Sequence, residues 1–173
     1  MISFMILVFI IGVVLRGISF RISSVHECAI LDQGGREYGR RNTKILATLH
    51  ILIYAAAFVE SFFELPLYPV VSGIGIVLYV FGMIMLFAVI KQLGSLWTVK
   101  LYIAKDHKII KTWLFKNVKH PNYYLNLLPE IVGYILIFNA WRTMAVLLPL
   151  YLISLGLRIY QEEKIMHAEL KDY

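Results

Sequence analysis

Long apolar runs separated by short polar or basic segments make up most of the chain. A membrane-spanning helix needs roughly 20 mainly apolar residues, and the pattern predicts five such helices. They are expected at about 1–20, 45–63, 67–90, 122–139 and 142–160. The fold class we expect is therefore an all-α integral membrane protein, a single domain over 1–173 with three spans in 1–90 and the rest in 91–173.

The first apolar run has the features of a retained transmembrane helix. No basic segment precedes it, no small-residue cleavage pattern is present, and its charges, Arg16 and Arg21, come late. A cleaved signal peptide shows the opposite arrangement.

Basic residues predict the orientation of the spans. The loops 21–44 and 91–121 hold five and seven Arg or Lys residues, whereas the two short turns hold none and one, Arg142. By the positive-inside rule, both long loops and the C-terminus face the cytoplasm and the N-terminus lies outside. The 139–142 segment is so short that the last two spans are expected to form a tight antiparallel hairpin.

The two long loops also carry structural signals. The first, 21–44, predicts a short interfacial helix flanked by turns. In the second, the alternation of apolar and polar residues over Thr98–Ile103, the following turn "AKDHK" and then Ile109 and Ile110 predict a short hairpin on the membrane surface.

Composition and charge narrow the class of protein. The chain is 60% hydrophobic, too apolar for a soluble globular protein of this size. Its net charge of +6 lies in blocks between apolar runs, a distribution that indicates anionic lipid headgroups rather than nucleic acid as the partner. The single Cys28 excludes an internal disulfide and a thiolate metal cluster.

The histidines show no metal-ligand spacing. His107 and His120 are 13 residues apart and His167 stands alone, so no metal site is predicted. Neither a Ser or Cys nucleophile motif nor a phosphate-binding glycine loop is present. His50 is interpreted as a packed polar residue near a helix start.

Polar residues interrupt the fourth span. A helix that begins at Pro121 places Asn122, Asn126 and Glu130 on one face, at successive i+4 positions, and Pro129 should kink it. An acid at mid-membrane costs about 2.5 kcal/mol on insertion scales. Two interpretations stay open: these side chains bond to neighbouring helices, or Asn126 and Glu130 belong to a substrate tunnel and face protein or water rather than lipid.

A second polar cluster follows the fifth span, where Arg158 and Glu162 lie four residues apart and Glu163 is next to them. On pattern alone, this is a self-paired helix end. The predicted hairpin, however, brings His120 and Asn122 to the same membrane depth. We therefore expect the two clusters to form one pocket.

At these residues the sequence resembles the isoprenylcysteine carboxyl methyltransferase family, small membrane enzymes that use S-adenosyl-L-methionine. The resemblance covers about 91–170. The elements that match, in the order of the family, are "LWTV" (Leu96 to Val99), "HKII" (His107 to Ile110), "WLF" (Trp113 to Phe115), "KHPNY" (Lys119 to Tyr123), Asn139 and "RIYQEEKIM" (Arg158 to Met166).

The resemblance implies a cofactor pocket made by the cytoplasmic loop between spans three and four and by the ends of spans four and five. Four positions would line the S-adenosyl-L-methionine site: His107, Phe115, His120 and Glu162. The resemblance places Arg158 and Glu163 at the substrate's reacting end and the cofactor, as catalytic residues.

The chain departs from the family pattern in places. Lys119 replaces an Arg, Trp113 and Phe115 replace the Gly and Tyr of a Gly-x-Tyr element, and the C-terminal tail is reduced to "HAELKDY". The N-terminal half is similar to bacterial members, some of which are associated with methylating lipid-like polyketides such as alkylpyrones. Prenylated proteins are the eukaryotic substrates.

The predicted residues suit methyl transfer to an ionised oxygen. A carboxylate with a pKa near 4 needs no general base at neutral pH, so holding methyl and oxygen in line at about 3–3.5 Å is the main task. Arg158 can orient the anion, the helix start at Pro121 favours the cofactor's carboxylate, and Tyr123 or Phe115 can face the sulfonium or adenine. A neutral phenol or enol would need a base, for which His120 or Glu163 is a candidate.

Three functions remain open from the sequence. The first is an O-methyltransferase of a lipophilic or prenylated acceptor, in the cell membrane with its active site towards the cytoplasm. The second is methyl transfer to a phospholipid amine, which would favour an acidic pocket over Arg158. The third is a non-catalytic membrane subunit with the same fold.

Overall fold

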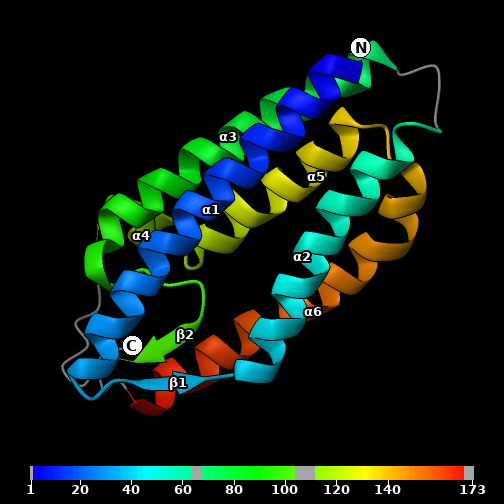
Figure 1. Ribbon diagram of the computed structural model, residues 1–173. Coiled ribbons are helices and arrows are strands. Elements are labelled where there is room, and N and C mark those ends of the chain that lie inside the picture. Colours follow the sequence, from blue (N-terminus) through cyan, green and yellow to red (C-terminus); the bar gives the residue numbers. More distant parts are fainter. Residues whose placement is uncertain (1, 64–67, 104–111, 170–173) are drawn as a thin grey trace.

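The structure is a computed structural model that describes residues 2–63, 68–103 and 112–169. It is almost entirely helical (Figure 1). The long helices are α1 (Ile2–Asp32), α2 (Arg40–Glu60), α3 (Pro69–Leu93) and α6 (Trp141–Glu169). The shorter elements are β1 (Arg36–Tyr38), η1 (Gly94–Leu96), β2 (Leu101–Ile103), α4 (Trp113–Asn117), η2 (Asn122–Leu127) and α5 (Leu128–Ile137).

Four of the described helices are long and apolar enough to cross a membrane. They are Ile2–Asp32, Arg40–Glu60, Pro69–Leu96 and Trp141–Ala168. Their outward faces carry large exposed apolar side chains, such as Ile51, Val77 and Ile153, as expected of helices that face lipid. The chain is a multi-pass membrane protein. The fourth predicted span, 122–139, is helical but divided, and whether it crosses the membrane stays a prediction.

The division of that span has a local cause. Asn122–Leu127 form a π-helical turn, in which the Leu128 N–H donates to the carbonyl of Tyr123, five residues back. Pro129, which has no N–H, then occupies the first turn of α5, a position that proline tolerates. The predicted irregularity is therefore present, but as a π-helical turn before the proline. Such turns are common at functional sites.

The first long loop differs from the prediction. No separate interfacial helix forms, because α1 continues without a break to Asp32. The helix is capped by Gly34, whose φ is 80°. The Gly34 N–H donates to Leu31 O and the Gly35 N–H to Ile30 O, both at 2.9 Å, the glycine-ended cap that satisfies the last carbonyls of a helix.

The predicted surface strand is present with a different partner. β2 pairs antiparallel with β1, so that Tyr102 faces Glu37 across the ladder. The second arm of the predicted hairpin falls in 104–111, outside the described residues. The β1–β2 pair instead joins the two long loops, at the end of the molecule that also holds the last turns of α6 (Figure 1).

The helices form two packed pairs, α3 with α5 and α2 with α6. The predicted tight hairpin is therefore confirmed only at its turn, where Asn139 adopts a left-handed φ of 52° and accepts a hydrogen bond from the Tyr68 N–H at 3.1 Å. Beyond it, α5 and α6 diverge (Figure 1). α6 is held to α2 because Glu60 accepts hydrogen bonds from the Arg142 and Thr143 N–H groups at 2.7 and 2.8 Å. The divergence leaves room for a cavity between the pairs.

Glycines allow α3 and α5 to touch backbone to backbone. A Cβ on Gly133 would lie 2.5 Å from Tyr79 N and 2.7 Å from Gly75 O, and one on Gly75 would lie 2.6 Å from Ile137 N. Small residues of this kind let membrane helices approach closely. The rigid α3–α5 pair positions η2, and with it one wall of the site.

We expect Gly133→Ala to destabilise the protein. The added methyl group meets backbone atoms that cannot turn aside, and overpacking of this kind costs about 1–3 kcal/mol. Gly156→Ala is the matched control, because a Cβ added at Gly156 would have no neighbouring atom within 4 Å. Thermal unfolding in detergent should show a lower midpoint for Gly133→Ala alone. Equal midpoints for the two variants would contradict the packing described here.

Candidate active site

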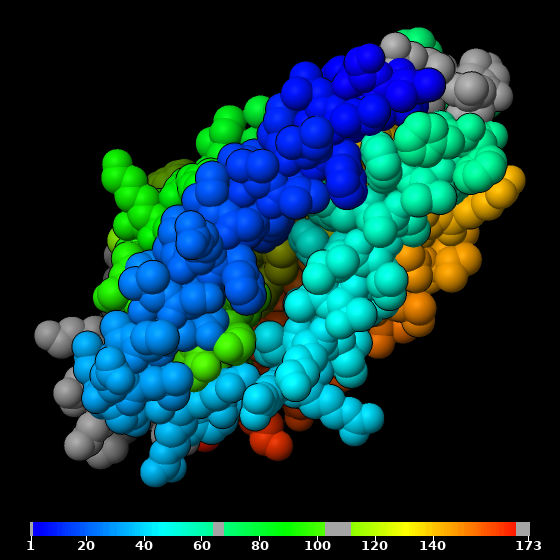
Figure 2. All heavy atoms as spheres, in the orientation of Figure 1, coloured from blue at the N-terminus to red at the C-terminus, as the bar shows by residue number. Residues whose placement is uncertain are grey.

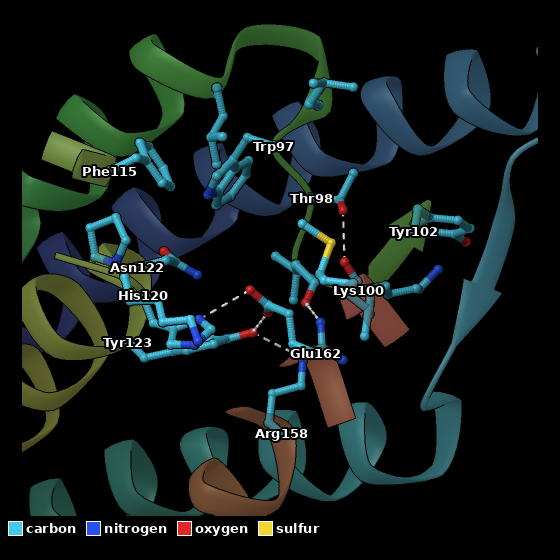
Figure 3. Close-up of a pocket in the computed structure, with 17 residues that line it drawn as sticks. Trp97, Thr98, Lys100, Tyr102, Phe115, His120, Asn122, Tyr123, Arg158 and Glu162 are labelled. Carbon is cyan, nitrogen blue, oxygen red and sulfur yellow. Dashed lines mark hydrogen bonds and ion pairs between the residues drawn. The ribbon is translucent and has the colours of Figure 1, made fainter. Parts of the chain in front are cut away.

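A cavity of about 220 Å³ lies at the end of the molecule that holds the β1–β2 pair. The connection from α3 to β2 forms one side, and η2 and α6 form the other (Figure 3). Its described lining residues are Leu93, Leu96, Trp97, Thr98, Val99, Lys100, Leu101, Tyr102, Phe115, Lys119, His120, Pro121, Asn122, Tyr123, Arg158, Glu162 and Met166. Aromatic rings and charged groups are thus mixed in one small space.

One wall of this cavity is a chain of hydrogen bonds between η2 and α6. Tyr123 donates its hydroxyl to Glu162, and the ring nitrogens of His120 lie 3.3 Å from Glu162 and 3.2 Å from Glu163. Arg158 Nε donates to the Tyr123 hydroxyl at 3.1 Å. The prediction that the start of span four and the end of span five meet is confirmed.

Arg158 is buried without a carboxylate partner. Its side chain donates to the Thr43 hydroxyl, the Val99 carbonyl and the Tyr123 hydroxyl, all neutral groups. Within the described chain no acid lies within ion-pair distance of this guanidinium, although the residue is only 3% exposed. A buried cation is costly unless an anion compensates it, and the Glu162 carboxylate is linked to Arg158 through the Tyr123 hydroxyl. Three of its five N–H donors are taken, so the remaining two can receive an anionic ligand.

The opposite wall is positioned by α1. His26 Nδ1 lies 2.8 Å from the Trp97 carbonyl, the Val99 N–H donates to Ser23 at 2.9 Å, and Lys100 pairs with Glu27 at 2.6 Å. The end of α1, beyond the predicted first span, therefore holds residues 97–100 against the cavity. A polar helix extension thus has a role in shaping the site.

A second, mostly apolar cavity of about 360 Å³ adjoins the first. It lies between α1, α2, α6 and η2, and the surface is hollowed between α1 and α2 (Figure 2). Its lining residues are Arg16, Gly17, Ser19, Phe20, Thr43, Leu46, Ala47, His50, Ile51, Trp97, Val99, Asn122, Tyr123, Leu127, Tyr151 and Arg158. Both cavities are lined by Trp97, Val99, Asn122, Tyr123 and Arg158. These five residues form the junction.

The junction contains an unmatched donor. Trp97 is 2% exposed, and its Nε1 has no hydrogen-bond partner among the described residues. Leaving a buried donor unpaired costs about 1–3 kcal/mol, and a bound ligand would remove that cost. Phe115 and Trp97 lie on the side of the cavity that faces His120 and Tyr123 (Figure 3), so a ligand there would sit between aromatic rings and charged side chains.

The structure separates the predicted site residues into four groups, of which the tunnel residues are described below. Those that line the first cavity are Phe115, His120, Pro121, Tyr123, Arg158 and Glu162. Glu163 lies at its edge, pairs with Lys119 at 2.8 Å and is not a lining residue. His107 falls outside the described residues.

The two predicted tunnel residues do not line either cavity. Asn126 and Glu130 are 1% and 0% exposed and lie behind Arg16, which does line the second cavity. Arg16 Nε donates to Glu130 at 2.6 Å, and its Nη2 lies 3.4 Å from the Asn126 amide. The sequence pattern shows Arg16 only as a late charge in the first span. The signal that could have found this pair is an Arg and a Glu, each inside an apolar run.

Other lining residues were also missed from the sequence. Thr43, His50 and Tyr151 reach the second cavity from two helices whose pairing no local pattern specifies. Trp97 and Val99 lie in the matched "LWTV" element, but nothing in its spacing shows that they stand between two cavities.

The pH dependence of stability should report on His120. Burial lowers the pKa of His120, but its hydrogen bonds with Glu162 and Glu163 outweigh burial and raise that pKa above the ordinary 6.5. A raised pKa means that His120 contributes stability fully below pH 6.5 and loses it as the pH rises through the raised value. The stability difference between the wild type and His120→Asn, from thermal unfolding, should therefore shrink above pH 6.5. A difference that does not change with pH would contradict the described pairing.

Comparison with known proteins decides the family. Residues 75–168 match the Isoprenylcysteine carboxyl methyltransferase (ICMT) family, just over half of the 173-residue chain. The chain belongs to the ICMT family. The matched residues include the parts of β2, η2 and α6 that line the first cavity, and the ICMT family is a family of methyltransferases.

Two relatives are similar to this protein over nearly the whole chain. An uncharacterised protein of Haemophilus influenzae is 42% identical over 152 residues, which cover 88% of this chain and 88% of that protein. The uncharacterised protein YpbQ of Bacillus subtilis is 26% identical over 162 residues, which cover 89% of this chain and 91% of that protein. No solved structure matches the chain.

Proposed function

We propose that this protein is an S-adenosyl-L-methionine-dependent O-methyltransferase that methylates an anionic oxygen of a lipophilic acceptor. The cofactor occupies the first cavity and the acceptor the second. The observation that carries the proposal is Arg158, a buried guanidinium without a carboxylate partner that lines both cavities. Membership in a methyltransferase family supports it.

The donor set of the first cavity fits the cofactor. S-adenosyl-L-methionine carries an ammonium, a carboxylate, a sulfonium and an adenine, and would supply an electrophilic methyl group. Glu162 can hold the ammonium or the ribose hydroxyls, and Lys100, which uses one N–H donor for Glu27, can receive the carboxylate. The rings of Phe115 and Tyr123 can face the sulfonium or stack on adenine. The unmatched Trp97 N–H supplies one more donor.

At the junction, Arg158 holds the acceptor anion through the N–H donors that Thr43, Val99 and Tyr123 leave free. The acceptor oxygen provides the electron pair for the new O–CH₃ bond, and the S–CH₃ bond breaks with its electron pair returning to sulfur. No proton moves if the oxygen is already ionised. Catalysis then depends on holding the methyl group and the acceptor oxygen in line and on excluding water. The buried Arg158 contributes to both.

The lining of the second cavity favours an oxygen over an amine as the acceptor. Two guanidinium groups, Arg16 and Arg158, are among the described lining residues, and no carboxylate is. A phospholipid amine would be a cation in its resting state and would meet like charge there. The apolar remainder of the wall, including Leu46 and Leu127, suits a hydrocarbon or prenyl chain. The hollow between α1 and α2 (Figure 2) is a route from the bilayer.

The active site is proposed to face the cytoplasm. It lies at the end of the molecule with the two long loops and the last turns of α6, and these loops carry most of the basic residues. Cytoplasmic cofactor and membrane-borne acceptor would then meet at the junction from opposite sides.

The test is transfer of a labelled methyl group. Purified protein in lipid vesicles would be incubated with methyl-labelled S-adenosyl-L-methionine and a lipid extract of the host cells. The proposal predicts label in an organic-soluble product that alkali releases if the acceptor is a carboxylate, and about 10²–10³-fold slower labelling with Arg158→Met. Label that appears only in an amine-containing phospholipid would overturn the proposal, as would no transfer by protein that binds the cofactor.

A further inference from the structure

Polar groups in the second cavity form two levels. At the first level Thr43 of α2 accepts a hydrogen bond from Arg158 of α6. At the second, His50 of α2 lies 3.2 Å from the hydroxyl of Tyr151 of α6. Each pair of positions, 43 with 50 and 151 with 158, is seven residues apart, or two helical turns. The two levels are therefore about 10 Å apart along the helices, at 1.5 Å per residue.

The second level is charged. Arg16 pairs with both carboxylate oxygens of Glu130, which also accepts a hydrogen bond from Tyr54 at 2.7 Å. His50 Nε2 lies 3.3 Å from the same carboxylate. Glu130 is fully buried, but Arg16 retains 20% exposure of its side chain, and it lines the cavity. The anion is thus hidden and the cation is presented to the ligand.

This level has unused hydrogen-bonding capacity. His50 Nε2 is buried and lies 3.3 Å from Glu130, and it makes no hydrogen bond among the described residues. Arg16 uses Nε and Nη2 for the two carboxylate oxygens of Glu130. Between the two levels the wall is apolar, with Leu46, Ala47 and Leu127. A purely hydrocarbon chain would offer no hydrogen-bond partner to the polar groups of the second level.

We infer that the acceptor carries a second oxygen, a hydroxyl or carbonyl, about 10 Å from the oxygen that is methylated, and that Arg16 and His50 bind it. This inference rests on the proposed function for the placement of the reacting oxygen at Arg158. The second oxygen is neutral, because Glu130 already balances the charge of Arg16. The site thereby selects an oxygenated lipid over a plain hydrocarbon tail.

The test compares two long-chain acids on the purified full chain in detergent. One is octadecanoic acid. The other carries a hydroxyl about nine bonds from its carboxylate, which spans about 10 Å in an extended chain at ~1.2 Å per bond. Displacement of a fluorescent fatty acid measures binding, and methyl transfer from S-adenosyl-L-methionine is followed in parallel. The wild type should bind the hydroxy acid about tenfold more tightly, the worth of one hydrogen bond to a charged group.

Variants assign that preference to the second level. His50→Phe keeps a ring against Tyr54, with which His50 stacks at 5.1 Å, and Arg16→Lys keeps a charge beside Glu130. Each variant should reduce the ratio of the two affinities, hydroxy acid over octadecanoic acid, to about onefold to threefold. Leu46→Ala, on the apolar wall between the levels, is the matched control, and should weaken both acids equally and keep their ratio.

The outcomes separate this inference from the proposed function. Equal binding of the two acids by the wild type, or a preference that both variants retain, overturns the inference even if both acids are methylated. A preference that the variants abolish, without any methyl transfer, supports the inference and counts against the proposed function. Failure of the wild type to bind either acid overturns the inference together with the proposed acceptor class.

Discussion

Replacing Arg158 with methionine is expected to lower the rate of methyl transfer by about 10²–10³-fold, the cost of removing a donor that stabilises a reacting oxygen. Methionine keeps much of the volume of the buried side chain but cannot orient an anion. Binding of S-adenosyl-L-methionine should survive, because Glu162 and His120 pair with each other without Arg158. The measurement is a labelled-methyl assay with cofactor binding followed beside it.

Two further variants sharpen this prediction. Arg158→Lys keeps the charge and loses the fork of donors, so its rate should fall between those of the wild type and Arg158→Met. Thr43→Val removes one neutral hydrogen-bond partner of Arg158. Its rate of methyl transfer shows how far the reaction depends on a fixed guanidinium. A fully active Arg158→Met would show that this residue only joins α6 to its neighbours.

The second large effect is expected on stability. Arg16→Met leaves the Glu130 carboxylate, which is fully buried, without its cation, and breaking a buried pair in this way costs about 3–5 kcal/mol. The double variant Arg16→Met with Glu130→Met should recover most of that loss, because no uncompensated charge remains. Unfolding in detergent measures all three proteins.

Arg21→Met is the matched control for that experiment. Arg21 lies on the same helix and is exposed, so its replacement should change the free energy of unfolding by no more than about 0.5 kcal/mol. A double variant that is no more stable than Arg16→Met would contradict the view that Glu130 is kept charged by Arg16.

The sequence predicted the framework well because hydrophobic run length is a strong signal. Four helices occupy the predicted spans, and the predicted meeting of His120 with Glu162, 42 residues away, is confirmed. The sequence pattern did not predict that α5 and α6 diverge. Their separation depends on the glycine contacts of α3 with α5 and on Glu60 holding α6 to α2, contacts between residues far apart in the chain.

The parts of the site that the sequence missed are of the same kind. Arg16 and Glu130 are 114 residues apart, so neither shows from its own neighbourhood that it has a partner. The pattern around Arg158 is visible as a motif, but its place between two cavities depends on four separate elements. His50 looks incidental in the sequence for the same reason, since its partner Tyr151 lies 101 residues away.

The most direct test of the account is calorimetry of S-adenosyl-L-methionine binding to the detergent-purified protein, with Glu162→Ala beside it. Glu162 lines the first cavity and is bonded by His120 and Tyr123, whereas Asp32→Ala, at the exposed end of α1, serves as the control. We expect binding in the micromolar range for the wild type and the control, and none for Glu162→Ala. A folded wild-type protein that does not bind the cofactor would contradict the methyltransferase assignment and favour a non-catalytic membrane subunit.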